Sequence, residues 1–127
     1  MTERTTINAP NVFRPSPAYS HAVVAAGLVF VSGTMAHDPE SGEIVGATEQ
    51  EQLAFALRNV ALILASAGSS LAKVVSATLI VVEDVDFKAI NEEWIKWFPN
   101  DPPARQGARF PISIPKVKVS VAVIAVV

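Results

Sequence analysis

The sequence predicts an α+β domain in which two helices pack on one face of a sheet of six strands. Three observations predict it. Runs rich in β-branched residues recur along the chain, two stretches of helical periodicity separate them, and the last run, residues 116–127, is apolar on both alternating faces. The order of elements is β-β-β-α-β-α-β-β, and 127 residues make one domain, 1–127, without room for a second.

The amino-terminal third predicts an edge strand and a hairpin. Residues 1–18 contain three prolines and few periodic apolar positions, so we expect a short edge strand and then an irregular loop. Two β-rich runs, 20–26 and 28–32, flank Gly27. This arrangement predicts a hairpin whose second strand ends at Ser32-Gly33.

The first helix has well-marked ends. Before it, the segment 37–42 (His-Asp-Pro-Glu-Ser-Gly) is dense in turn formers and should be an exposed loop. Thr48 and Glu51 have the spacing of a capping box, and Gly68 supplies a left-handed stop. Between these ends, apolar residues follow at helical spacing: Leu53, Leu57, Val60, Ala61 and Leu64.

A second helix and three strands complete the chain. Residues 72–82 are rich in β-branched residues and predict a strand, and Arg105 marks the start of another. The helix between them runs from about Asp86 to Phe98, before Pro99, with one apolar face: Phe87, Ile90, Trp94 and Phe98. The strand 116–127 should be covered on both sides, by the helices and, most simply, by another subunit.

Composition excludes several classes of function. The net charge of −2 and the pI near 5.6 argue against nucleic-acid binding, which needs clustered Lys and Arg. The chain has no cysteine, so disulfides, thiolate catalysis and the zinc site of nucleobase deaminases are excluded. The amino terminus does not resemble a signal peptide and no apolar stretch is long enough to span a bilayer, so we expect a cytoplasmic protein without a membrane partner. A hydrophobic content of 50% is high for a small monomer and indicates a subunit interface.

Few residues suggest chemistry by themselves. His21 and His37 fall in a predicted strand and in a turn loop, without the spacing of metal ligands. The acidic pairs fall at helix starts or on helix faces expected to be exposed: Glu49/Glu51, Glu83/Asp84 and Glu92/Glu93. Arg105 differs, because a rigid Pro-Pro-Ala segment precedes it and aims a side chain suited to bind a carboxylate. From the residues alone, a surface ion pair is still its commoner role.

A series of segments resembles the reactive-intermediate deaminase (Rid, or YjgF-type) family over nearly the whole chain. Each segment is weak evidence, but their order and spacing together are specific. The matching residues are Ser16-Pro17-Ala18-Tyr19-Ser20-His21-Ala22, Leu28-Val29-Phe30-Val31-Ser32-Gly33, Asp38-Pro39, Ser41-Gly42-Glu43, Asn59-Val60, Ala67-Gly68, Val85-Asp86-Phe87, Ile90-Asn91 and Pro103-Ala104-Arg105.

The resemblance implies a fold, an assembly and an activity. The fold would be chorismate-mutase-like with a six-stranded mixed sheet, and the assembly a homotrimer with a central β-barrel and clefts between subunits. The activity would be hydrolysis of enamines or imines such as 2-aminoacrylate to a 2-keto acid and ammonia, without metal or cofactor. By position, Arg105 would bind the substrate carboxylate, and the remaining pocket residues would be Tyr19, which could come from the neighbouring subunit, together with Ser32, Gly33 and Gly107.

One position departs from the family pattern. The family carries a glutamate on the last strand that positions or activates the attacking water, and the matching position here is Ser120, with Ala122 as the next residue on that face. A serine can orient a water but is no general base near neutral pH. A backbone carbonyl near Gly107 could take the role, or activity toward 2-aminoacrylate could be weak.

Other functions stay open at this point. The substrate could be a larger conjugated amino acid such as 2-aminomuconate, with Arg109 supplying charge for a second carboxylate, although a surface or interface ion pair is its commoner role. The chain could also form a non-catalytic trimer that binds small carboxylic acids or acts like a chaperone, which Ser120 favours. The ribonuclease activity attributed to some relatives is disfavoured, because the sequence has no basic groove.

Overall fold

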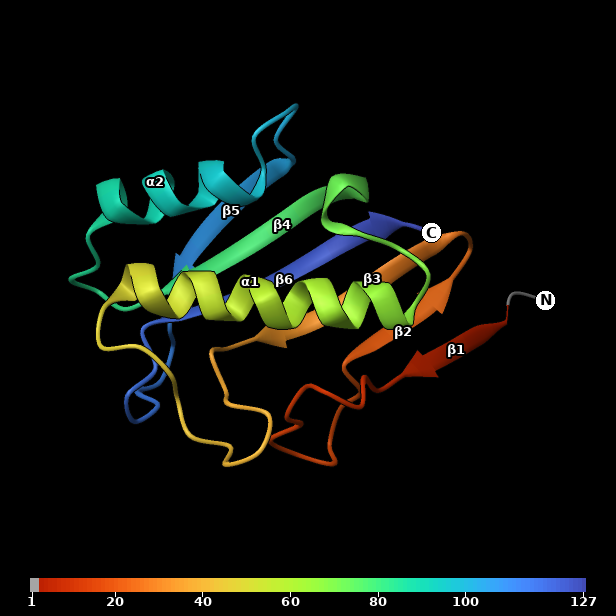
Figure 1. Ribbon diagram of the computed structural model, residues 1–127, viewed down its shortest axis with the longest axis horizontal. Coiled ribbons are helices and arrows are strands. Elements are labelled where there is room, and N and C mark those ends of the chain that lie inside the picture. The colour runs from red at the N-terminus through yellow and green to blue at the C-terminus, as the bar shows by residue number, and fades with distance from the viewer. Residues whose placement is uncertain (1–2) are drawn as a thin grey trace.

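A computed structural model describes residues 3–127 and confirms the α+β prediction (Figure 1). One sheet holds all six strands in the order β1-β2-β3-β6-β4-β5, with β4 and β5 parallel and the other neighbours antiparallel. Both helices lie on the same face of this sheet. The elements are β1 (Arg4–Ile7), β2 (Ala22–Ala25), β3 (Leu28–Thr34), α1 (Glu49–Ser66), a short 3-10 turn (Leu71–Lys73), β4 (Val74–Val81), α2 (Phe87–Trp97), β5 (Ala104–Arg109) and β6 (Val119–Val126).

The predicted hairpin is present, but its strands do not begin and end at all of the predicted residues. Ala26 and Gly27 both have positive φ, 53° and 75°, as in the tight turns whose twist suits a two-residue hairpin. The second strand does not end at Ser32-Gly33, because pairing with β6 resumes at Thr34 after a bulge that begins at Val31. This bulge places Gly33 inside the sheet rather than beyond it.

Helix α1 supplies most of the core, as its sequence predicts. Its capping box is complete, since Thr48 accepts from the backbone of Glu51 and the Glu51 side chain accepts from the backbone of Thr48. Gly68 has a φ of 78°, which confirms the left-handed stop. The expected apolar stripe is buried except for Ala61, which is half-buried, while Ile63 joins the core: Leu53, Leu57, Val60, Ile63 and Leu64.

Helix α2 packs as expected along most of its length. Asp86 caps it, and Ile90, Trp94 and Phe98 are buried. The expectation for Phe87 is wrong, because this side chain is 46% exposed. Burial of α2 begins one turn later, at Ile90.

Glu93 on α2 is buried, contrary to the expectation of an exposed acidic face. The packing of α1 against α2 covers this side of the helix. The carboxylate accepts hydrogen bonds from Gln50 of α1 and from Lys96 and Trp97 of its own helix, at 3.3, 3.3 and 2.9 Å. Burial opposes ionisation, but these hydrogen bonds outweigh it and hold the pKa of Glu93 below its usual value. The residue therefore has a structural role, as expected for the acidic pairs.

The last strand has two different faces in the single chain. Strand β6 begins at Val119 instead of residue 116, because Lys116 adopts a left-handed φ of 67° in the preceding turn. One face is buried under the helices, which confirms one of the two predicted covers: Val119, Val121, Val123 and Ala125. The other face of the sheet carries apolar side chains that this chain leaves partly open, including Phe30 at 42% exposed and Val126 at 44%. Its cover by another subunit stays a prediction.

Candidate active site

The predicted site residues fall into two groups in the single chain. Tyr19, Ser32, Gly33 and Ser120 line one open pocket of about 350 Å³, together with Met35. Arg105 and Gly107 lie instead on the edge strand β5. The fold therefore brings four of the six residues together and keeps two apart.

Gly33 and Ser120 face one another across the bulge between β3 and β6. Ser120 is 5% exposed, and a Cβ placed on Gly33 would come within 3.0 Å of its Oγ. No side chain fits at position 33 unless the serine hydroxyl moves. The glycine thus leaves its own backbone open to the pocket, beside the Ser120 hydroxyl.

Tyr19 is held at this pocket by the segment that precedes β2. The Oγ of Ser32 donates a 2.7 Å hydrogen bond to the carbonyl of Ser20, and the backbone N–H of Ser32 donates to the carbonyl of His21 at 3.0 Å. These bonds fix the neighbours of Tyr19 against β3. Burial raises the pKa of the Tyr19 phenol, so the phenol stays protonated near pH 7 and can donate a hydrogen bond.

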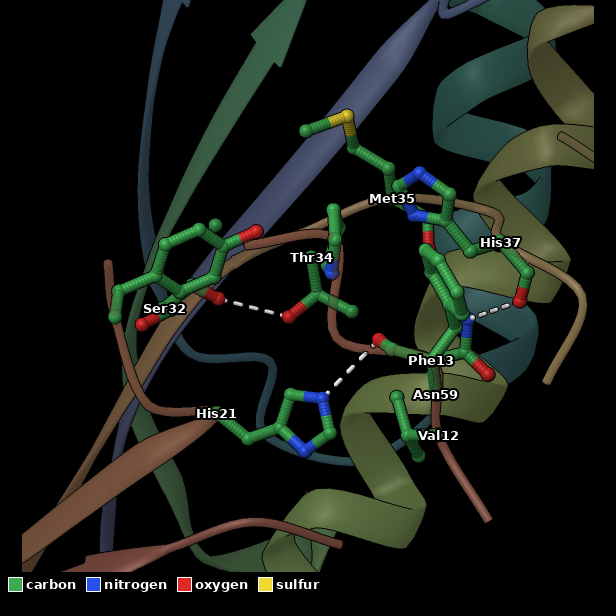
Figure 2. Close-up of a pocket in the computed structure, with 11 residues that line it drawn as sticks. Val12, Phe13, His21, Ser32, Thr34, Met35, His37 and Asn59 are labelled. Carbon is green, nitrogen blue, oxygen red and sulfur yellow. Dashed lines mark hydrogen bonds between the residues drawn. The ribbon is translucent and has the colours of Figure 1, made fainter. Parts of the chain in front are cut away.

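His21 organises the amino-terminal loop and lies just before β2, not within a strand as expected. Its Nδ1 accepts from the backbone N–H of Ala9 at 2.9 Å, and its Nε2 donates to the carbonyl of Phe13 at 3.1 Å (Figure 2). The Ala9 donor assigns the proton to Nε2. Because its own backbone N–H also donates to Asn8, the residue holds the loop with three hydrogen bonds. His21 is therefore a structural residue.

Arg105 is positioned by two residues of α2. Its Nη2 donates a 2.8 Å hydrogen bond to Oδ1 of Asn91, and its guanidinium lies 5.0 Å from the centroid of the Trp94 ring. Asn91 belongs to a segment that resembles the family, Ile90-Asn91, but the resemblance assigns it no role. The helical spacing does indicate that Asn91 lies near Trp94, because residues three apart share one side of a helix.

Arg105 and Ser120 point to opposite faces of the sheet. Arg105 pairs with Ala77 of β4, which is buried under the helices, whereas Ser120 pairs with Ile80. Positions 77 and 80 are an odd number of residues apart on an unbulged stretch, so their side chains face opposite ways. One copy of the chain therefore cannot present both side chains to one substrate.

Gly107 and Arg109 complete strand β5. Gly107 pairs with Leu79, and a Cβ there would approach the Leu79 carbonyl to 3.3 Å. Arg109 donates from Nη1 to Oε1 of Glu83 at 3.0 Å, with both side chains largely exposed. This contact confirms the surface ion pair as the role of Arg109 in the single chain.

Two further features bear on the class of protein. Within residues 3–127, no group of three or more His, Asp or Glu side chains is close enough together to hold a metal ion. Over the same residues, no helix has both the length and the apolar character needed to cross a membrane.

Comparisons with known proteins agree with the fold and with the resemblance in the sequence. The family model described as endoribonuclease L-PSP matches residues 6–127. Reactive Intermediate Deaminase A of Arabidopsis thaliana is 37% identical over 101 residues, which cover 80% of this chain and 52%, about half, of that relative. The 2-iminobutanoate/2-iminopropanoate deaminase of Homo sapiens is 34% identical over 101 residues, covering 80% of this chain and 72% of the relative.

A solved structure extends the similarity to the whole fold. The crystal structure of E. coli TdcF with bound serine superimposes with a TM-score of 0.87 at 27% identity, covering 97% of this chain and 98% of the other. The chorismate-mutase-like fold is thereby confirmed. From the matched family model and these relatives, the chain belongs to the reactive-intermediate deaminase family, also called YjgF or L-PSP.

Proposed function

We propose that this chain is a hydrolytic deaminase of small enamine or imine intermediates, releasing a 2-keto acid and ammonia. The observation that carries the proposal is Arg105, an exposed guanidinium held by Asn91 and stacked on Trp94. Only one of its N–H groups is used by Asn91, so others are left for a carboxylate. The names of the relatives support the reaction, and serine bound to TdcF is a small carboxylate-bearing molecule.

The complete site would form between copies of the chain. Arg105 and Gly107 would come from one copy, and the pocket of Tyr19, Ser32, Gly33 and Ser120 from its neighbour. Two observations support this arrangement: the opposite directions of Arg105 and Ser120, and the partly open apolar face that includes Phe30. A homotrimer with a central barrel would cover that face and create three such clefts.

The reaction needs mainly orientation and charge. Arg105 would hold the carboxylate, and the Tyr19 phenol and Ser120 hydroxyl would donate to or orient the reacting groups. Once the enamine has become an imine, water adds to its electrophilic carbon and ammonia leaves. No metal or cofactor is required for these steps.

The proposal is tested with freshly generated 2-aminoacrylate, following keto acid and ammonia. We expect the wild type to accelerate release above the spontaneous rate and Arg105→Ala to lose most of this gain. Arg109→Ala is the matched control, since Arg109 lies on the same strand but pairs with Glu83 at the surface. No acceleration by the wild type contradicts the substrate, and an unaffected Arg105→Ala contradicts the role of the arginine.

A second candidate is a non-catalytic trimer that binds small carboxylic acids. It is favoured by one observation, a serine at position 120 in place of the family glutamate. It predicts binding of a 2-keto acid that depends on Arg105 without any turnover of 2-aminoacrylate. Turnover of 2-aminomuconate instead, seen as loss of its absorbance, would identify a larger conjugated substrate.

A further inference from the structure

His37 lies beside the proposed substrate pocket, on the loop that follows β3. Its backbone pairs with Ile44 in an antiparallel bridge, and its carbonyl accepts a 3.1 Å hydrogen bond from Nδ2 of Asn59 on α1. The imidazole packs against the Phe13 ring, with 5.3 Å between the two centroids (Figure 2). The backbone is thus held by two other segments, which fixes the position from which the ring projects.

His37 is one of the residues that line a small hollow, and this hollow adjoins the substrate pocket. The hollow has about 10 Å³ of free space, near the smallest volume that holds one water molecule. Tyr19, Ser32, Gly33 and Met35 line both this hollow and the larger pocket that contains Ser120. A water held beside His37 would therefore be next to the space that the substrate occupies.

The two histidines of this hollow differ in their hydrogen bonds. Both ring nitrogens of His21 are engaged, whereas none of residues 3–127 hydrogen-bonds to the His37 ring. Burial lowers the pKa of His37 below its usual 6.5, so the ring is neutral near pH 7 and one nitrogen lone pair can accept a proton. Tyr19, the other titratable group there, stays protonated because burial raises its pKa.

We infer that His37 is the base that takes the proton of the attacking water, a role that rests on the deaminase function proposed above. In the first step the water oxygen bonds to the carbon of the protonated imine, the electron pair of the C=N bond moves to nitrogen, and His37 takes one proton from the water. His37 then passes this proton to the amine nitrogen of the carbinolamine. The carbinolamine hydroxyl loses its proton to the imidazole as the C–N bond breaks, and the imidazolium proton goes to the released ammonia. Protonated imine and water thus give keto acid and ammonium.

Such a base would supply what Ser120 lacks. No carboxylate or lysine lines either the small hollow or the substrate pocket among the residues that the structure describes. General-base assistance is typically about 10²–10⁴-fold in rate, whereas a hydroxyl can only orient the water. Among residues 3–127, His37 is the group lining the hollow that is both neutral at pH 7 and free at a basic nitrogen.

The charged groups around the His37 loop are balanced in sign. The carboxylate of Asp38 stays ionised because the backbone N–H groups of Ser41 and Glu40 lower its pKa, and the positive charge of Arg58 on α1 adds to this effect. Glu43 pairs with Lys116 at 3.7 Å. Tyr19 and His21 share the hollow with His37, and the charged groups on its loop, with their partners from other segments, are Asp38, Glu43, Arg58 and Lys116.

The test compares His37→Gln with wild type and with Glu40→Gln, an exposed position on the same loop. Glutamine keeps the backbone contacts but cannot take a proton near pH 7. We expect kcat for 2-aminoacrylate to fall by about 10²-fold or more in His37→Gln with little change in KM. The wild-type rate should also fall on acidification through an apparent pKa below 6.5, and this dependence should disappear in His37→Gln.

The outcomes separate the two proposals. A wild type without acceleration overturns both the deaminase function and the role of His37. An active wild type with an equally active His37→Gln overturns only the role of His37. If circular dichroism shows that His37→Gln is unfolded, the wild-type profile decides, because a flat rate between about pH 5 and 8 overturns the role. Restoration of His37→Ala by added imidazole supports it.

Discussion

The guanidinium of Arg105 is held by a 2.8 Å hydrogen bond from its Nη2 to Oδ1 of Asn91. The two residues come from different elements, the edge strand β5 and the helix α2. An arginine on an edge strand would otherwise sample many rotamers, and a ligand that fixes one of them would reduce the side-chain entropy. The amide of Asn91 thus prepares Arg105 to bind a carboxylate.

Asn91 should affect substrate binding more than turnover. In Asn91→Ala the guanidinium loses its acceptor. We expect KM to rise about 3- to 10-fold, which corresponds to the free energy of a typical hydrogen bond, while kcat stays nearly unchanged. Asn91→Asp should raise KM further, because a carboxylate at this position competes with the substrate for Arg105. Steady-state kinetics check both variants, and Asn100→Ala, an exposed position past the end of α2, serves as the control. Equal KM values in Asn91→Ala and wild type would mean that Arg105 needs no such support.

Gly33 and Ser120 should be coupled in stability. Gly33→Ala places a Cβ 3.0 Å from Oγ of Ser120, and we expect a loss of about 1–3 kcal/mol from this overpacking. Ser120→Ala removes the Oγ, so the double variant should recover part of that loss. Chemical denaturation of the wild type, both single variants and the double variant measures the coupling energy. Strict additivity would show that the two side chains do not meet.

Glu93 should stabilise the fold in a pH-dependent way. Its folded pKa lies below the usual 4.5, so the contribution is fully present above pH 4.5 and is lost as pH falls through the folded value. Glu93→Gln removes the charge, and we expect a loss on the order of 1–2 kcal/mol at pH 7 that disappears in acid. Thermal unfolding from neutral to acidic pH measures the difference, with the exposed neighbour Glu92→Gln as control. A difference that stays constant with pH would contradict an ionised Glu93.

Phe30 should decide the assembly state. It is 42% exposed on the sheet face that the helices leave open, so Phe30→Glu would place a charge in the proposed subunit interface. Analytical ultracentrifugation should then show a shift from trimer to monomer. Phe87→Glu is the matched control and should leave the assembly state unchanged. Phe87 is similarly exposed, at 46%, but lies at the start of α2. A Phe30→Glu variant that stays trimeric would place the interface elsewhere.

Most of the fold could be predicted because periodicity and end signals are local. The capping box of Thr48 and Glu51 and the stop at Gly68 depend on residues close in sequence, and all appear in the structure. The burial of Glu93 could not be predicted in this way, because it depends on a contact between distant segments. Glu93 is buried because α1 packs on α2. Its hydrogen-bond partner on α1, Gln50, is more than forty residues away in the sequence.

The candidate site was predictable only in part. The resemblance predicts which residues form the site, but the directions of their side chains depend on strand register, which a single bulge changes. The bulge after Val31 brings Gly33 to Ser120, and the pairing of Arg105 with Ala77 turns that side chain toward the helices. No sequence pattern reports these registers. The contact of Asn91 with Arg105 needs both the parallel pairing of β5 and the position of α2.

The opposite directions of Arg105 and Ser120 have a genetic consequence. If each site takes Arg105 from one copy and the Gly33 pocket from the next, two different inactive variants can rescue one another. Subunits carrying Arg105→Ala keep an intact pocket, and subunits carrying Gly33→Val keep an intact arginine. Random mixing in equal amounts would then leave about one site in four with both halves intact. Neither inactive allele gives activity by itself. Co-expression of the two alleles in one cell would restore measurable activity.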